Sequence, residues 1–103
     1  MNRYGEVTLI SRTYTVDSIG QEILDEETQS TIQCTIESVG RNEWATAMQS
    51  GYAADIVAKV FSASYHGESI AQYNGKQYEI YRAYQDGDRT ELYLGTKVGE
   101  ING

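Results

Sequence analysis

The chain has 103 residues with no proline and one cysteine, and eight Lys and Arg against fifteen Asp and Glu give a formal net charge of −7. This length predicts a single domain, residues 1–103, with one modest core. No apolar run is long enough to cross a membrane, and the N-terminal residues lack the apolar stretch of a signal peptide, so we expect neither membrane insertion nor secretion by that route. A domain this acidic is not expected to hold DNA by general electrostatic attraction, although an acidic wall lets DNA slide past without sticking.

The numbers of cysteines and tyrosines further limit which disulfides, metal sites and interfaces the chain can form. A single cysteine excludes an internal disulfide and any metal site built from several thiolates. Cys34 shares one strand face with Ile32 and Ile36, which favours a buried, unreactive thiol. Nine tyrosines against one phenylalanine are typical of strand surfaces and also of subunit interfaces.

The first third of the chain has the pattern of two strands around a turn. Residues 5–16 alternate as a strand does, and Asp17-Ser18-Ile19-Gly20 has the composition of a turn. Residues 21–30 are acidic and only weakly apolar, and their Asp25-Glu26-Glu27 run favours a solvated loop or strand edge over a cation site. Residues 31–39 return to strong β character.

A short helical insertion around residues 41–55 follows. Gly40 breaks the preceding strand, Asn42 is a candidate N-cap, Glu43 places negative charge in the first turn, and Gly51 can end the helix in the left-handed conformation. A helix of two to three turns is not stable alone, so its apolar face is expected to dock on the strands or on a neighbouring subunit. That face consists of Trp44, Ala47 and Met48.

The second half is rich in strand signals. Asn74-Gly75 is the strongest hairpin signal in the chain and favours a type I′ turn, Gly67 marks another connection, and Asp86-Gly87-Asp88 gives a second reversal. These signals predict an all-β fold: a small antiparallel β-barrel or sandwich of five to six strands with one short helical insertion. We expect four strands here, at residues 56–63, 69–73, 77–84 and 90–98. The predicted core residues are Ile32, Ile36, Val60, Ile80, Leu92 and Leu94.

No motif points to catalysis, so we expect no enzyme, no cofactor and no bound metal. His66 is the only histidine, lies beside Gly67 in a predicted connection, and has no activated nucleophile near it in sequence. Asp86-Gly87-Asp88 lacks the remaining ligands of a calcium loop, and no glycine motif for phosphate is present.

A series of short motifs runs from Arg41 to Val98. They are Asn42-Glu43-Trp44, Gln49 to Gly51, Tyr65 with Gly67-Glu68, Tyr73 to Lys76, Tyr78 to Arg82, and Glu91-Leu92-Tyr93. With these motifs the chain resembles the phage head-tail adaptor family, also described as head closure, head-tail joining or stopper proteins. It departs from the family pattern at Met48, at Ser50 and at Ala53-Ala54, which affects the length and pose of the helical insertion.

The resemblance implies a structural virion protein that forms a ring between portal and tail, extends or closes the DNA channel, and docks the tail. Its implied partners are other copies of itself (a monomer in solution being compatible with this), a portal-side adaptor and a tail-side protein. DNA would pass through the ring without sequence-specific binding, and no membrane is involved. The protein would be made in the bacterial cytoplasm, from a phage or prophage gene, and end in the virion.

Three groups of residues receive roles in this interpretation. The insertion either lines and closes the channel or merely caps the barrel, and the glycines and Asn74 make turns. The channel residues are Asn42, Glu43, Trp44, Thr46, Gln49 and Ser50. The expected ring contacts include Tyr65, Tyr73 and Tyr81, and the structural turns are Gly40, Gly51, Gly67, Asn74 and Gly75.

Two other readings stay open from the sequence. One is a small OB-like nucleic-acid-binding barrel, which needs cations among aromatics on one face, whereas Tyr78, Arg82 and Tyr84 supply only one cation. The other is a tail terminator or minor tail protein.

A cross-strand ion pair between Glu68 and Arg82 is also expected.

Overall fold

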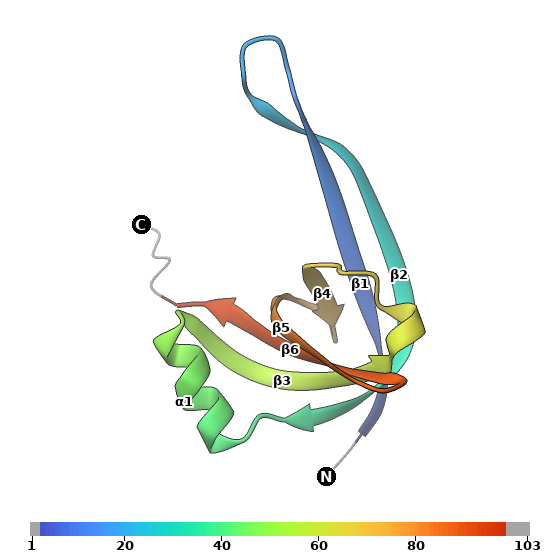
Figure 1. The fold of residues 1–103 in the computed structure, drawn as a ribbon, viewed down its shortest axis with the longest axis vertical. Helices are drawn as coiled ribbons and strands as arrows, with labels where there is room; N and C mark the ends of the chain where they lie inside the picture. Colours follow the sequence, from blue (N-terminus) through green and yellow to red (C-terminus); the bar gives the residue numbers. More distant parts are fainter. Residues whose placement is uncertain (1–2, 99–103) are drawn as a thin grey trace.

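The computed structural model describes residues 3–98 and is made mostly of β-strands (Figure 1). The expected all-β fold with one short helix is confirmed, with six strands in the described residues. The elements are β1 (Arg3–Val16), β2 (Glu22–Ser38), α1 (Arg41–Gln49), β3 (Tyr52–Phe61), a 3-10 turn (Ser62–Ser64), β4 (Ile70–Tyr73), β5 (Lys76–Asp86) and β6 (Arg89–Lys97).

The six strands form one antiparallel sheet that closes on itself. The order around the sheet is β1-β2-β3-β6-β5-β4, and β4 pairs back onto β1 through three residues, Thr8 to Ile10. The β4–β5 hairpin lies between β3 and β6 in sequence, yet β3 and β6 pair along nearly their full length. Closure leaves one enclosed face for the apolar side chains of every strand.

The core occupies the inside of this closed sheet. Four of the six predicted core residues are buried: Ile36, Val60, Leu92 and Leu94. Ile32 and Ile80 are partly buried and pack against the core. Val7 and Leu9 from β1, Ala58 from β3 and Ala71 from β4 complete it, together with Tyr78 and Cys34.

Beyond the closed sheet, β1 and β2 continue as a two-stranded hairpin, which we call the arm (residues 11–30). Figure 1 shows it extending away from the other strands along the longest axis of the molecule. The predicted turn at residues 17–20 is confirmed, and of the two alternatives for residues 25–27 the strand edge is the observed one, because β2 already begins at Glu22. Cross-strand pairing with β1 holds the polar residues 21–30 extended, even though all ten are exposed.

The turns follow the glycine signals. Asn74 and Gly75 have φ values of 56° and 81°, so both central residues are left-handed, as a type I′ turn requires. Gly51, with φ 91°, ends the helix as expected, and its N–H donates to the Met48 carbonyl at 3.1 Å. The expected N-cap is wrong: the helix begins at Arg41 and the N-cap position is Gly40, which offers no side-chain acceptor.

The helical insertion is shorter than expected. The helix ends at Gln49 and β3 starts at Tyr52, so residues 52–55 belong to the sheet and not to the insertion. Tyr52 to Ala54 pair with β6. A bulge between Ala54 and Ile56 interrupts the alternation of inward and outward side chains, so the sequence pattern did not indicate a strand here.

A second bulge corrects the expected faces of β5. Ile80 lies opposite Leu94 and faces the core, but the register shifts before Arg82, which lies opposite Tyr93 on the outer face. Arg82 and Tyr84 therefore do not share the face of Tyr78 and Ile80. The expected Glu68–Arg82 ion pair is also wrong, because Arg82 pairs with Glu43 on α1 at 2.6 Å.

Candidate functional site

The tip of the arm is a well-defined turn. The Asp17 carboxylate accepts hydrogen bonds from the backbone N–H groups of Ile19 at 3.0 Å and Gln21 at 2.9 Å. Gly20 takes φ 86° and donates its N–H to the Asp17 carbonyl at 3.1 Å. These bonds fix the turn, so Ile19 is held out at the very end of the arm with 76% of its surface exposed.

The arm carries apolar side chains that no other part of the described chain covers. Tyr14 and Leu24 lie directly opposite each other on one face, and Ile23 lies opposite Thr15 on the other. A two-stranded ribbon is a single layer and cannot bury such residues by itself, and exposed apolar groups on a projecting element are typical of binding surfaces. Their exposed fractions are Tyr14 54%, Val16 66%, Ile19 76%, Ile23 49% and Leu24 53%.

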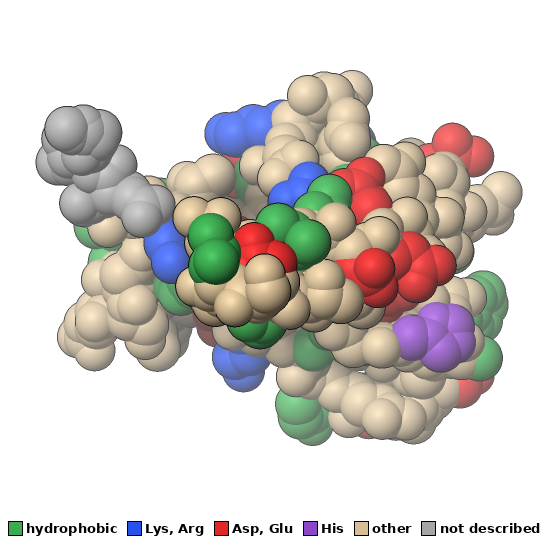
Figure 2. Space-filling model, turned by 90° about the horizontal axis from the view of Figure 1, so that it is seen from above, with side chains coloured by type: hydrophobic (Ala, Val, Ile, Leu, Met, Phe, Trp, Pro, Cys, Tyr) green, Lys and Arg blue, Asp and Glu red, His purple; other side chains and the backbone are tan. Residues whose placement is uncertain are grey.

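The arm is also the most acidic part of the molecule, with five carboxylates against one arginine, Arg12. Arg12 is already paired with Glu27 at 2.8 Å, and that hydrogen bond, followed by one from Gln29, lowers the pKa of Glu27. The other acidic side chains join none of the ion pairs found among residues 3–98. Viewed from the tip end, hydrophobic and acidic groups lie side by side (Figure 2).

The arm also has two free strand edges. β1 pairs with β4 only as far as Ile10, and β2 pairs with β3 only from Thr35 onward. Within the part of the chain that the structure describes, the backbone between these points has a strand partner on one side alone. Unpaired edges of this length are docking surfaces unless charge protects them, and the carboxylates of β2 supply such charge.

A second cluster lies on the outer face, where α1 meets β5. The Tyr81 ring stacks on Tyr52 with 5.1 Å between centroids, and the Tyr81 hydroxyl donates to Glu43 at 2.7 Å. Arg82 donates to the other oxygen of Glu43 at 2.6 Å, and its guanidinium lies 4.0 Å from the centroid of the Tyr93 ring. Glu43 therefore anchors the helix to the sheet. No local sequence signal identifies Tyr81 or Arg82 as its partners.

The other residues expected on the channel insertion are exposed. Of the predicted apolar face only Ala47 is buried, while Trp44 and Met48 are 48% and 38% exposed. The helix thus packs on the sheet through Ala47, its smallest apolar residue, and leaves the Trp44 indole about half exposed to solvent. The remaining exposed residues of this group are Asn42, Thr46, Gln49 and Ser50.

The three tyrosines expected at ring contacts have partners within the chain. Tyr65 and Tyr73 pack against the core, and the Tyr65 hydroxyl donates to the Glu68 carbonyl at 2.9 Å. Tyr81 belongs to the cluster with Glu43. The tyrosines with the greatest exposure are Tyr4 at 91%, Tyr14 at 54% and Tyr84 at 53%.

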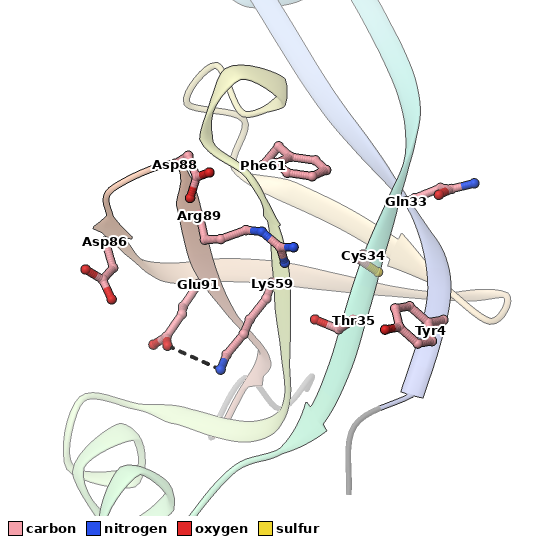
Figure 3. A pocket seen from close by; sticks show the side chains of 10 residues that line it. All are labelled: Tyr4, Gln33, Cys34, Thr35, Lys59, Phe61, Asp86, Asp88, Arg89 and Glu91. Atoms are coloured by element: carbon pink, nitrogen blue, oxygen red, sulfur yellow. Dashed lines mark ion pairs between the residues drawn. The ribbon is translucent and has the colours of Figure 1, made fainter.

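An open depression of about 610 Å³ lies between the start of β1, the middle of β2 and the β5–β6 turn (Figure 3). The hollow has two cationic side chains, and both already have partners. Arg89 lies over the exposed Phe61 ring at 4.6 Å, and Lys59 contacts Glu91 at 3.7 Å. Cys34 lines the hollow, but burial, then the charge of Glu6, raises its pKa to about 11, which keeps the thiol protonated at neutral pH. Three carboxylates complete the lining: Asp86, Asp88 and Glu91.

No arrangement suited to metal binding is found in the described residues, since no three His, Cys, Asp or Glu side chains gather there. His66 is exposed, and Glu68 accepts a hydrogen bond from the His66 backbone N–H at 2.7 Å. No helix of residues 3–98 is both long and apolar enough to cross a membrane. In comparisons with known proteins, no family model matches the chain and no curated protein matches it.

The hydrogen-bonded tyrosines predict an alkaline transition. Burial, then a hydrogen bond to a carboxylate, raises the pKa of Tyr78 (bonded to Asp55) and of Tyr93 (bonded to Glu91) from 10.0 to about 12. Since these hydroxyls hold their protons more tightly when folded, their stabilisation is complete below pH 10 and is lost as pH rises toward about 12. Tyrosinate absorbance and circular dichroism, followed together, should show late-titrating tyrosines whose ionisation coincides with unfolding. Nine tyrosines that titrate together at the ordinary pKa in a folded chain would contradict these contacts.

Proposed function

We propose that this protein is a structural subunit of the connector between head and tail of a tailed phage. In this proposal, copies form a ring that extends or closes the DNA channel and offers a docking surface to the tail. The sequence resemblance from Arg41 to Val98 suggests this setting. The observation that carries the proposal is the arm, whose exposed apolar side chains need a partner that residues 3–98 of the subunit do not supply.

The charge distribution supports an assembly protein through which DNA moves freely. The nucleic-acid-binding alternative requires cations available beside exposed aromatic rings. On the outer aromatic face Arg82 is paired with Glu43, and the hydroxyls of Tyr52 and Tyr93 donate to Glu79 and Glu91. On this face the arginine and the tyrosine hydroxyls are bound to carboxylates, and the face therefore repels phosphate. Such a face suits the wall of a DNA channel better than a DNA-binding site.

The role of α1 in this ring remains part of the proposal. Its polar residues are exposed and available to a channel, as closure of the channel would require. The bond from Glu43 to Tyr81 and the burial of Ala47 equally suit a helix that caps the sheet. In either case α1 is fixed to the subunit, so closure by this segment would involve exposed side chains such as Thr46 and Gln49 and not unfolding of the helix.

The proposal is tested by deleting the gene in the phage or prophage that encodes it. We expect separate tails and heads that fill but then lose their DNA, and restoration of joined particles by the wild-type gene supplied in trans. Electron microscopy of the purified chain, free or added to the tailless heads, should show rings with a central opening. Normal tailed, infectious particles from the deletion strain would contradict the proposal.

A further inference from the structure

We propose that, within the ring of the proposed function, the tip of one subunit's arm docks into a hollow beside α1 of the next subunit. The occupant is therefore a second copy of this chain. The proposal rests on the ring function and specifies the contact that would build it. Three features of the subunit lead to it: an apolar hollow, its charge, and its position relative to the arm.

The hollow lies where β2 passes into α1 and has a volume of about 480 Å³. Trp44 is half exposed there, and the Val39 side chain beside it is partly exposed as well. Gly40 provides room at the helix start because nothing lies within 4 Å of where its Cβ would be. The hollow is lined by Val39, Gly40, Arg41, Trp44 and Ala45.

The charge of this hollow is opposite to that of the arm. Arg41 is its only charged residue, is exposed, and belongs to none of the ion pairs found among residues 3–98. The arm tip presents Ile19 between Val16 and Ile23, with the unpaired carboxylates of Glu22 and Asp25 close by in sequence. An apolar tip with acidic flanks matches an apolar hollow with a basic rim.

The other available surfaces fit the arm less well. The larger hollow near Phe61 carries Asp86, Asp88 and Glu91, which would repel an acidic tip. Pairing of two arms along their β2 edges would bring the carboxylates of residues 22–27 against their own copies, and facing like charges oppose such pairing. Complementarity therefore favours the α1 hollow of another subunit.

The contact in the proposed ring is directional. The molecule measures 50 × 32 × 25 Å, and along its longest axis α1 lies toward the opposite end from the arm tip (Figure 1). In the proposed ring each subunit gives its arm tip to one neighbour and receives the arm of another, whereas a reciprocal exchange between two subunits would close a two-fold dimer, stop the cross-linked products described below at dimers and overturn the proposal. Repeated from copy to copy, the one-way contact produces a ring when the rotation closes.

Cross-linking tests the contact in the full chain. Ile19→Cys places a thiol at the arm tip and Ala45→Cys places one in the hollow, while the wild type, whose Cys34 is buried, is the control. With a short bis-maleimide, we expect the double variant to give a ladder of dimers, trimers and larger species. An equal mixture of the two single variants should give dimers only, and neither single variant alone should cross-link.

Charge reversal tests the specificity of the ladder. Arg41→Glu should reduce the cross-linking yield about tenfold or more, because facing like charges weaken an interface by at least that factor. Combining Arg41→Glu with Glu22→Arg should restore the yield. Asp86→Arg, in the other hollow, should leave it unchanged.

The outcomes separate the contact from the ring. Efficient cross-linking of Ile19→Cys alone would mean arm-to-arm pairing and would overturn the proposal, as would preferential cross-linking of Ile19→Cys to Asp88→Cys. Wild-type rings seen by electron microscopy without a ladder from the double variant would overturn this contact and leave the ring function standing. Neither rings nor a ladder, both with the free chain and with the chain added to tailless heads, would overturn both.

Discussion

Truncating Leu9 to alanine should lower the free energy of unfolding by about 2–5 kcal/mol, the range for a large buried aliphatic side chain. Leu9 is completely buried and lies where β1 leaves the closed sheet to form the arm, opposite Ala71 of β4. The loss has two parts, the transfer free energy of the removed atoms and the cavity that the rigid sheet cannot fill by collapsing. Urea denaturation followed by circular dichroism would measure it.

Leu24→Ala is the matched control, since it makes the same chemical change on the arm. Leu24 is 53% exposed, so we expect its truncation to change subunit stability by less than about 0.5 kcal/mol. The same variant should weaken ring formation if the arm is an interface. Equal destabilisation by the two substitutions would mean that the arm is part of the folding core.

Gly95→Ala should destabilise the subunit by about 1–3 kcal/mol, as expected when an atom is forced into a packed interior. A Cβ at Gly95 would lie 2.7 Å from the Ala53 carbonyl oxygen and 3.2 Å from a ring carbon of Tyr81. The nearer obstacle is backbone of the paired strand β3, which cannot move without breaking the β3–β6 ladder. Thermal and urea unfolding of the variant would show the loss.

Gly5→Ala separates this clash from the general effect of adding a methyl group in a strand. At Gly5 the nearest atom, at 3.2 Å, belongs to the Tyr73 ring, which can shift. We expect Gly5→Ala to cost at least about 1 kcal/mol less than Gly95→Ala, helped by the lower entropy of the unfolded chain. If both variants unfold at the same denaturant concentration, the close approach of β3 to Gly95 is not a constraint.

Local signals allowed much of the fold to be predicted. Asn74-Gly75 specified its turn because only a left-handed backbone closes a two-residue hairpin with the right twist, and the period-2 placement of Leu92 and Leu94 identified the core face. Features that depend on distant strands were missed. The strand predicted from residue 31 begins at Glu22 because β1 pairs with the acidic residues, which selects the strand edge over the loop, and the bulge before Arg82 reversed the faces of the last part of β5.

The candidate site was predicted less well, for the same reason. The partner of Glu43 is 38 residues away in sequence, at Tyr81, and no spacing rule connects the two. The apolar residues of the arm resemble an ordinary alternating strand until the structure shows that no second layer from residues 3–98 covers them. One available signal was the coincidence of the Asp17–Gly20 turn with flanking Val16 and Ile23, which predicts an exposed hairpin tip.

The assembly state of a subunit without its arm tests most directly whether the arm builds a ring. Replacing residues 11–28 by Asn-Gly would join Ile10 to Gln29, its partner on β2, through a short hairpin turn. Native mass spectrometry and electron microscopy of this variant beside the wild type should show rings only for the wild type, with the shortened chain folded and monomeric. Rings of the same size and yield from the armless variant would contradict this account.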